Sequence, residues 1–407
     1  MSCVLRAATL RCSALLVLGC GQEEQAAEPP LASVTEIRIT EPDLMLEPEP
    51  LMAIGGARDL PGHDLHRVGG ARFLGADQLV VANSGSLTIR YFSLEGVLLR
   101  EVGRGGEGPG EFGLLHTVHR FGPDTVAAWD PGLRRITLFD ASGRTGRTVA
   151  VDIEAEAARR ARVTTPLYLH TMEGTHFVVV TIQVRARYPT GLSREPHYAA
   201  VLDVTGTAVG GALLEGNERY NRSGSGGTLV PQSYRLYAAA LPEAFWVGNG
   251  RGGDLTGYDG EGGAVRFARL PVVREPITAA DRDRMLESLR ATIHPATSAA
   301  GRERIEDRFR AAAALVDSLP SFTGLVAGAE CLWVQLSRRQ SQPQPWLVTA
   351  PMSGIARRIT LPPDVEVLDA AGNRVALLSR DEFDRAEIRV HRVSSQGSTP
   401  ICNTHPE

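Results

Sequence analysis

Short apolar runs separated by turn residues recur along the chain at a regular interval. Residues 73–82 and 121–130 share one pattern, in which the end of a strand, a turn and a second strand follow one another. The likeness continues through 87–102 and 135–149, where two further runs are joined by a turn that contains glycine. This pattern predicts units of four strands that span about fifty residues each.

Looser copies of the same unit follow at 163–214, 234–270 and 324–361. The last unit offers only three strands, at 365–369, 374–378 and 386–393. The segment 34–40 alternates apolar and polar residues, and we expect it to supply the missing strand and so to close the ring. The prediction is an all-β chain, folded over residues 34–400 as a single six-bladed β-propeller, because closure of this kind leaves no exposed sheet edge.

One stretch departs from the strand pattern and predicts a small insertion of two helices at 276–319. Thr278 can cap the first helix with Asp281 in a capping box, and Pro295 ends it. Apolar residues recur at helical spacing along both helices. They are Met285, Leu286, Leu289 and Ile293 in the first and Ile305, Phe309, Ala312, Val316 and Leu319 in the second.

Three tryptophans fall at one position of the repeated unit. Trp129, Trp246 and Trp333 each lie on the predicted second strand. Large aromatic side chains at a repeated strand position are what packing between neighbouring sheets requires. We therefore interpret them as core residues rather than as a surface for stacking sugars.

The first nineteen residues have the pattern of a signal peptide, with Arg6 and Arg11 before a short apolar run. The four residues 17–20 (Val-Leu-Gly-Cys) resemble the lipobox of bacterial lipoproteins, which implies that Cys20 is acylated and becomes the first residue of the mature chain. Residues 20–33 are polar and contain prolines, as in a flexible tether. Gly21 after the cysteine, by the same resemblance, implies an outer-membrane lipoprotein; whether its body faces the periplasm or the exterior stays open.

The charge and the cysteines narrow the choice of partners and compartment. The net charge is −4 and no residue is lysine, so nothing indicates the clustered positive charge of a nucleic-acid-binding protein. Of five cysteines, three lie within residues 1–20, which leaves Cys331 and Cys402 to pair in an oxidising compartment. The sequence alone leaves their pairing open.

The connector at 103–112 is rich in glycine and carries one proline, Pro109, between two repeated units. With the paired repeats around it, this segment resembles the NHL-type six-bladed propellers found among bacterial lipoproteins. The resemblance covers residues 66–151. It implies the fold and gives no ligand, because the later units lack such a connector.

The long connections of the predicted propeller gather on one side of it. Loops on a rigid scaffold are where recognition usually resides. We therefore expect a membrane-tethered, monomeric binding module, or scaffold, that holds a protein, a peptide or a small ligand on this face. The candidate contacts are Arg187, Tyr188, Arg194, Tyr220 and Arg222, chosen for contact area and planar charge.

The alternative is an enzyme with a metal in its central channel. His119 and His170 lie at corresponding positions of neighbouring units, and Asp369 could approach them. Imidazole and carboxylate groups ligate calcium or zinc, and some six-bladed lyases and lactonases hold a metal in the channel. No nucleophile motif and no catalytic residue is found in the sequence, which favours binding over catalysis. A purely structural protein of the cell envelope is the third possibility.

Overall fold

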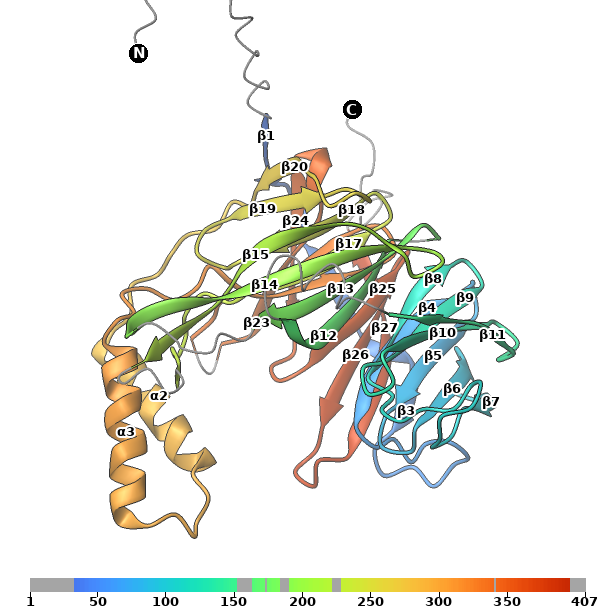
Figure 1. Cartoon of the computed structure of the whole chain (residues 1–407), viewed down its shortest axis with the longest axis horizontal. Coiled ribbons are helices and arrows are strands. Elements are labelled where there is room, and N and C mark those ends of the chain that lie inside the picture. Colours follow the sequence, from blue (N-terminus) through green and yellow to red (C-terminus); the bar gives the residue numbers. More distant parts are fainter. Residues whose placement is uncertain are drawn as a thin grey trace, which may run out of the picture. The chain divides into compact units, whose positions relative to one another are not determined.

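The computed structural model describes residues 33–151, 163–172, 174–183, 190–221, 228–339 and 342–395. Strands dominate these residues, and the first two repeated units form one antiparallel four-stranded sheet each (Figure 1). The first consists of β4 (Val68–Leu74), β5 (Gln78–Asn83), β6 (Thr88–Ser93) and β7 (Leu98–Val102). The second consists of β8 (Thr117–Gly122), β9 (Thr125–Asp130), β10 (Arg135–Asp140) and β11 (Thr145–Ala150).

The next two sheets keep this order and add a strand. One contains β12 (Val163–Met172), β13 (His176–Gln183), β14 (Gly191–Asp203), β15 (Ala208–Asn221) and the short β16 (Thr228–Leu229). The other contains β17 (Tyr237–Leu241), β18 (Ala244–Gly248), β19 (Asp254–Tyr258) and β20 (Ala264–Arg269), with β1 (Val34–Glu36) at its outer edge.

A nine-stranded sheet accounts for the remaining strands, and it contains two antiparallel sets of four. The first set is β21 (Phe322–Ala327), β22 (Leu332–Leu336), β23 (Gln344–Ala350) and β24 (Ile355–Leu361), and a short 3-10 helix η1 (Pro351–Ser353) joins its last two strands. The second set is β25 (Glu366–Ala371), β26 (Arg374–Arg380), β27 (Ala386–Ser395) and β3 (Leu44–Gly55). A single parallel pairing, Ile359 with Leu44, joins the sets, and β2 (Arg38–Ile39) pairs with β24.

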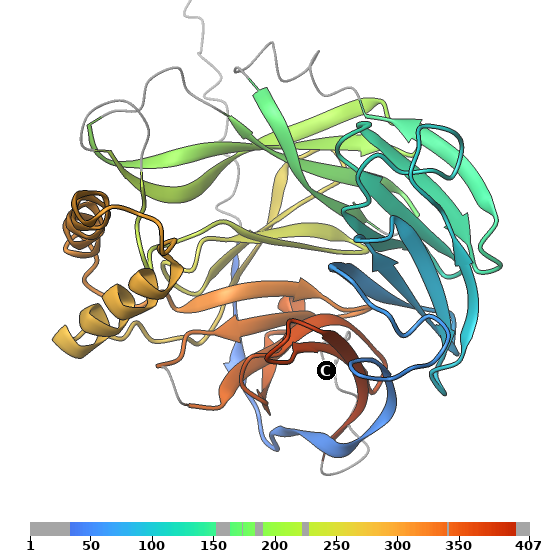
Figure 2. The ribbon, with the colours of Figure 1, turned by 90° about the horizontal axis from the view of Figure 1, so that it is seen from below.

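The first strands of these sets contact one another in a closed cycle, from β4 through β8, β12, β17, β21 and β25 back to β4. Figure 2 shows the sheets following one another around a common centre in the order of the sequence. Antiparallel sheets placed radially around a centre are the arrangement of a β-propeller. The all-β, propeller-type fold expected from the repeats is thus confirmed.

The hydrophobic core lies between consecutive sheets. Val80 and Tyr91 of one sheet pack with Val126 and Phe139 of the next, and all four are fully buried. The three repeated tryptophans lie on β9, β18 and β22 and are 0–2% exposed, as the sequence predicts for core residues. Replacement of such a residue by alanine typically costs about 3–5 kcal/mol of folding free energy.

Four hairpins are closed by one local device, an aspartate whose carboxylate accepts hydrogen bonds from the backbone two and four residues further on. The residues are Asp140, Asp203, Asp259 and Asp381. At Asp140 the bonded Ser142 hydroxyl and backbone donors lower the pKa to about 2. Such side chains bond the turn backbone locally and so fix the strand register.

The strand that completes the last set is not the one that the sequence predicts. We expected 34–40 to do so, but β1 and β2 pair in parallel with the outer strands β20 and β24. The missing strand is β3, which pairs antiparallel with β27. Its prolines, Pro48 and Pro50, argue against a strand, yet they are tolerated because β3 is an outer strand with an irregular register at His391.

The two helices of the insertion are α2 (Ala279–Thr292) and α3 (Ala299–Ala313). Thr278 and Asp281 form the expected capping box of α2. The chain leaves α3 at Ala313, so Val316 and Leu319 follow the helix and pack with Ile277 and Val230 in a small cluster of their own. Figure 1 shows the insertion beside the far ends of β14 and β15.

Candidate functional site

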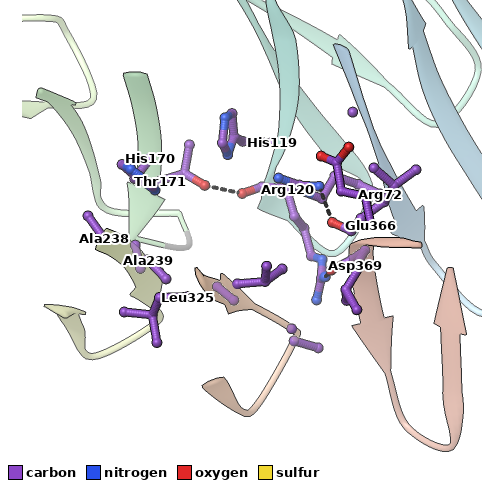
Figure 3. Close-up of a pocket in the computed structure, with 18 of the residues that line it drawn as sticks. Arg72, His119, Arg120, His170, Thr171, Ala238, Ala239, Leu325, Glu366 and Asp369 are labelled. Carbon is purple, nitrogen blue, oxygen red and sulfur yellow. Dashed lines mark hydrogen bonds and ion pairs between the residues drawn. The ribbon is translucent and has the colours of Figure 1, made fainter. Parts of the chain in front are cut away.

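The first strands surround a cavity of about 210 Å³ that lies where the cycle of strands closes. Its lining comes from β4, β8, β12, β17, β21 and β25, with short flanking segments. The polar side chains of this lining face the centre, so packing between sheets does not dictate their chemistry. In Figure 3 the charged side chains Arg72, Glu366 and Asp369 occupy one side of the cavity, and Ala238, Ala239 and Leu325 occupy the other, below His170 and Thr171.

An ion pair between Arg120 and Asp369 joins β8 to β25. The Nη2 atom of Arg120 donates to both carboxylate oxygens of Asp369, at 3.0 and 2.9 Å. Asp369 is fully buried, and its Oδ2 also accepts the backbone N–H of Phe73 at 2.8 Å. A buried charge of this kind needs its partners, so this pair ties three first strands together at the cavity.

Arg72 is a second arginine in the cavity, and it forms no ion pair with a carboxylate among the described residues. Its Nη1 atom donates to the backbone carbonyls of Ala71 and Leu368, at 2.7 and 2.6 Å. Burial lowers the pKa of Arg72, and the nearby charge of Asp369 opposes this effect. Glu366 also lines the cavity, and burial raises the pKa of its carboxyl group.

Two histidines line the cavity close to each other. The ring centroids of His119 and His170 are 5.9 Å apart, and His170 also packs against Phe245 at 5.3 Å. Burial, and then the charge of Arg72, lowers the pKa of His170 to about 4 and that of His119 well below its ordinary value. Both rings are therefore neutral at pH 7 and offer one donor and one acceptor each.

The opposite wall is apolar and smooth. It is formed by Ala238, Ala239 and Ala240 of β17 and by Leu325, Val326 and Ala327 of β21. Leu325 and Ala239 also belong to the core between the sheets of β17 and β21, which fixes them in place. The cavity thus offers hydrogen bonds and charge on one side and van der Waals contact on the other, as small-molecule sites commonly do.

The three residues of the metal alternative, His119, His170 and Asp369, do line this one cavity. However, Asp369 already holds Arg120 and a backbone N–H, and two guanidinium groups lie beside the histidines. Across the ranges that the structure describes, no three metal-ligating side chains are close enough to share an ion. The charges around the cavity favour an anion over a divalent cation.

Of the five residues expected to contact a partner, Arg187, Tyr188 and Arg222 lie outside the described residues. We expected Arg194 and Tyr220 in loops, but β14 and β15 extend as a ribbon and contain them. Arg194 forms ion pairs with Glu215 and Glu218, which neutralise its charge. Tyr220 packs against the apolar cluster around Val230. The same cross-strand pairs explain why these segments are strands.

Arg72, Arg120 and Glu366 are cavity residues that the sequence reading missed. The repeat itself held the signal, because Arg72 precedes Phe73 as Arg120 precedes Phe121 in the two units that match best. A charged residue repeated before a buried phenylalanine, on a first strand, marks a position that faces the centre. The sequence-based prediction for the channel named His119, His170 and Asp369 but neither arginine.

The helices of the described residues include none that is long and apolar enough to cross a membrane. Cys20, the expected site of acylation, lies outside those residues. Cys331 is buried and disulfide-bonded.

No family model and no curated protein matches the chain. Solved structures similar to it include a Bacteroides fragilis protein named for its expected export, at 10% identity and a TM-score of 0.46, covering 90% of this chain and 100% of that one. A DUF4221 member from Bacteroides vulgatus matches at 8% identity and a TM-score of 0.46, over 87% of this chain and 99% of that one. Virginiamycin B lyase from Staphylococcus aureus matches at 8% identity and a TM-score of 0.37, over 86% and 99%. Likenesses this low assign no activity.

Proposed function

We propose that the chain is an exported six-bladed propeller that binds a small ligand in its central cavity. The count of six treats the nine-stranded sheet as two blades, because it contains two antiparallel sets of four joined by one parallel pairing. The cycle of six first strands supports the same count. The resemblance to NHL-type propellers belongs to this proposal.

The observation that carries the binding function is the two-sided cavity. Fixed charge from Arg72, Arg120 and Asp369 faces a wall of small apolar side chains across about 210 Å³. That volume lies below the roughly 300–1,000 Å³ of drug-sized sites, so the ligand is small. Binding is preferred to catalysis because neither the sequence nor the cavity offers a nucleophile paired with a base.

A thermal-shift screen of the mature chain tests this function. The compounds are small anions, cations and neutral molecules, and the matched variant is Ala238→Leu, which fills the cavity from its apolar wall. A ligand at about a hundred times its Kd adds about 2.7 kcal/mol to the folding free energy, which raises Tm by a few degrees. We expect at least one class to raise Tm in the wild type and not in Ala238→Leu. If no class does so, or if the variant responds equally, the cavity is not the site.

Export through a lipoprotein signal is part of the same proposal. It is supported by the pattern of residues 1–20 and by the disulfide at Cys331, since such bonds persist in oxidising compartments. Intact-mass spectrometry of the membrane fraction tests it, with Cys20→Ala as the comparison. The mature wild type should begin at Cys20 and carry lipid mass. A chain that begins elsewhere without lipid contradicts the anchor.

A second candidate is the docking of a protein or peptide at the face of the helical insertion. The ribbon of β14 and β15 packs against this insertion through Tyr220, and a second cavity of about 300 Å³ lies between α2, α3 and the loop after β22. Alanine at Arg187, Tyr188 and Arg222 together should abolish capture of a partner from the envelope at an unchanged Tm; Tyr220 is kept because it packs into the cluster around Val230. Unimpaired capture would reject this face.

A further inference from the structure

We propose that the ligand of the central cavity is a small organic monocarboxylate, held by Arg72 through its carboxylate and by the alanine wall through an apolar body. This inference rests on the proposed function and names the chemistry of its ligand. It is carried by how the charges of the cavity pair with one another and by what lies opposite them.

The charged groups of the cavity pair unevenly. Asp369 is fully buried and is taken by Arg120, which approaches both of its oxygens. Arg72 makes only carbonyl hydrogen bonds among the described residues, through Nη1, which leaves Nε and Nη2 of its planar fork unused. A guanidinium group whose Nε and Nη2 atoms are free presents two parallel N–H donors, which match the two oxygens of a carboxylate.

The free donors of Arg72 set the charge of the ligand. Glu366 lies near Arg72 but forms no ion pair with it within 4.0 Å among the described side chains, so no carboxylate of the cavity occupies these donors. Arg120 is already neutralised by Asp369. One negative charge therefore completes the cavity, whereas a dianion would leave a second charge buried without a partner.

Two further buried nitrogen atoms without hydrogen-bond partners also favour a ligand that carries oxygen atoms. Nε of Arg120 and Nε2 of His119 are buried and have no hydrogen-bond partner among the described residues. Buried polar atoms are rarely left unpaired in folded proteins. Ligand oxygens on the polar side of the cavity could supply partners, and the neutral His119 ring can donate as well as accept.

The remainder of the ligand must suit the opposite wall. Ala238, Ala239 and Leu325 present methyl groups and no donor or acceptor side chain. A hydroxyl or amine placed there would lose its water without gaining a partner. The body of the ligand is therefore a short, branched or cyclic hydrocarbon group.

Isothermal titration of the mature chain with 4-methylpentanoate tests this assignment. Two comparison compounds keep the branched hydrocarbon and change the head group: 4-methylpentanamide is neutral and 3-methylbutylamine is a cation. The third, succinate, is a dianion of similar length without the branched end. We expect binding of 4-methylpentanoate alone, or at least tenfold more tightly than each of the other three. Equal or tighter binding of the amide, the amine or succinate overturns the assignment.

Variants locate the contact. Arg72→Met should weaken binding of 4-methylpentanoate about tenfold or more, the effect of losing a charge-assisted pair. Arg374→Met is the matched control, because Arg374 also donates to a backbone carbonyl, that of Ala76, but lies outside the cavity. It should bind as the wild type does. Glu366→Gln, which removes a competing carboxylate without removing a partner of Arg72, should bind more tightly.

Two outcomes separate this inference from the function on which it rests. If the thermal-shift screen finds a neutral or cationic ligand that Ala238→Leu excludes, the cavity is the site and the monocarboxylate is wrong. If Arg72→Met is too unstable to titrate, Glu366→Gln decides: unchanged or weaker binding of 4-methylpentanoate overturns the role of Arg72.

Discussion

The polar and apolar walls of the cavity come from the same strand of the repeated unit and have opposite chemistry. Arg72, Arg120 and Asp369 come from first strands, and so do Ala239 and Leu325. The second strands, by contrast, repeat a buried tryptophan in three units. A position that packs against the next sheet is held to one chemistry, whereas a position that faces the centre is free to differ. Differences among first strands therefore determine the chemistry of the cavity.

Removing the shared carboxylate should have the largest effect on stability. Asp369→Ala leaves Arg120 and the N–H of Phe73 buried without their partner, which should cost about 3–5 kcal/mol of unfolding free energy. Urea unfolding measures this loss. The control is Asp307→Ala in α3, whose exposed ion pair with Arg310 should contribute less than about 1 kcal/mol. Similar losses in the two variants would mean that the polar wall is not a structural network.

The apolar wall should respond less strongly. Leu325→Ala removes a side chain that is 8% exposed and belongs to the core between two sheets. The expected cost is about 2–3 kcal/mol, measured by the same urea titration. Leu213→Ala on β15 is the matched control, since Leu213 is 61% exposed and should lose under about 0.5 kcal/mol. A loss at Leu325 as small as that at Leu213 would show that the wall is not packed.

The smallest effect should be a pH dependence from the histidine pair. The pKa of His170 is about 4 in the folded chain and 6.5 when unperturbed, so the unfolded state takes up the proton first as the pH falls. Its contribution is present above pH 6.5 and is lost between pH 6.5 and 4. His170→Gln should remove on the order of 1–2 kcal/mol of that decline, after allowance for water in the cavity. Thermal unfolding across this range measures it, and an unchanged slope would contradict the neutral state of His170.

The strands, the turns and the helical insertion could be predicted from the sequence because each has a local cause. Thr278 caps α2 by contacts within one turn, and Asp140 closes its hairpin by contacts within four residues. The closing strand β3 could not be predicted, because its partner β27 lies more than 300 residues later in the chain. In addition, Pro48 and Pro50 argue against a strand at this position.

The candidate site was predicted only in part, for a related reason. His119 and His170 stood out as metal-binding residue types, and they do line the cavity. What that cavity favours depends on which cation Asp369 pairs with, and Arg120 lies 249 positions away from it. The repeat in the sequence predicts which side chains face the centre, but it does not predict which of them form ion pairs across the cavity.

The pairing of β3 with β27 also constrains the order in which the strands can pair during folding. Leu44–Gly55 is synthesised among the first strands and Ala386–Ser395 is the last strand of the described residues, so the cycle of sheets stays open until nearly the whole chain has emerged. Contacts this distant in sequence form slowly, after local hairpins. Until then the outer edge of β27 is unpaired, and an unpaired strand edge is open to pairing with other chains.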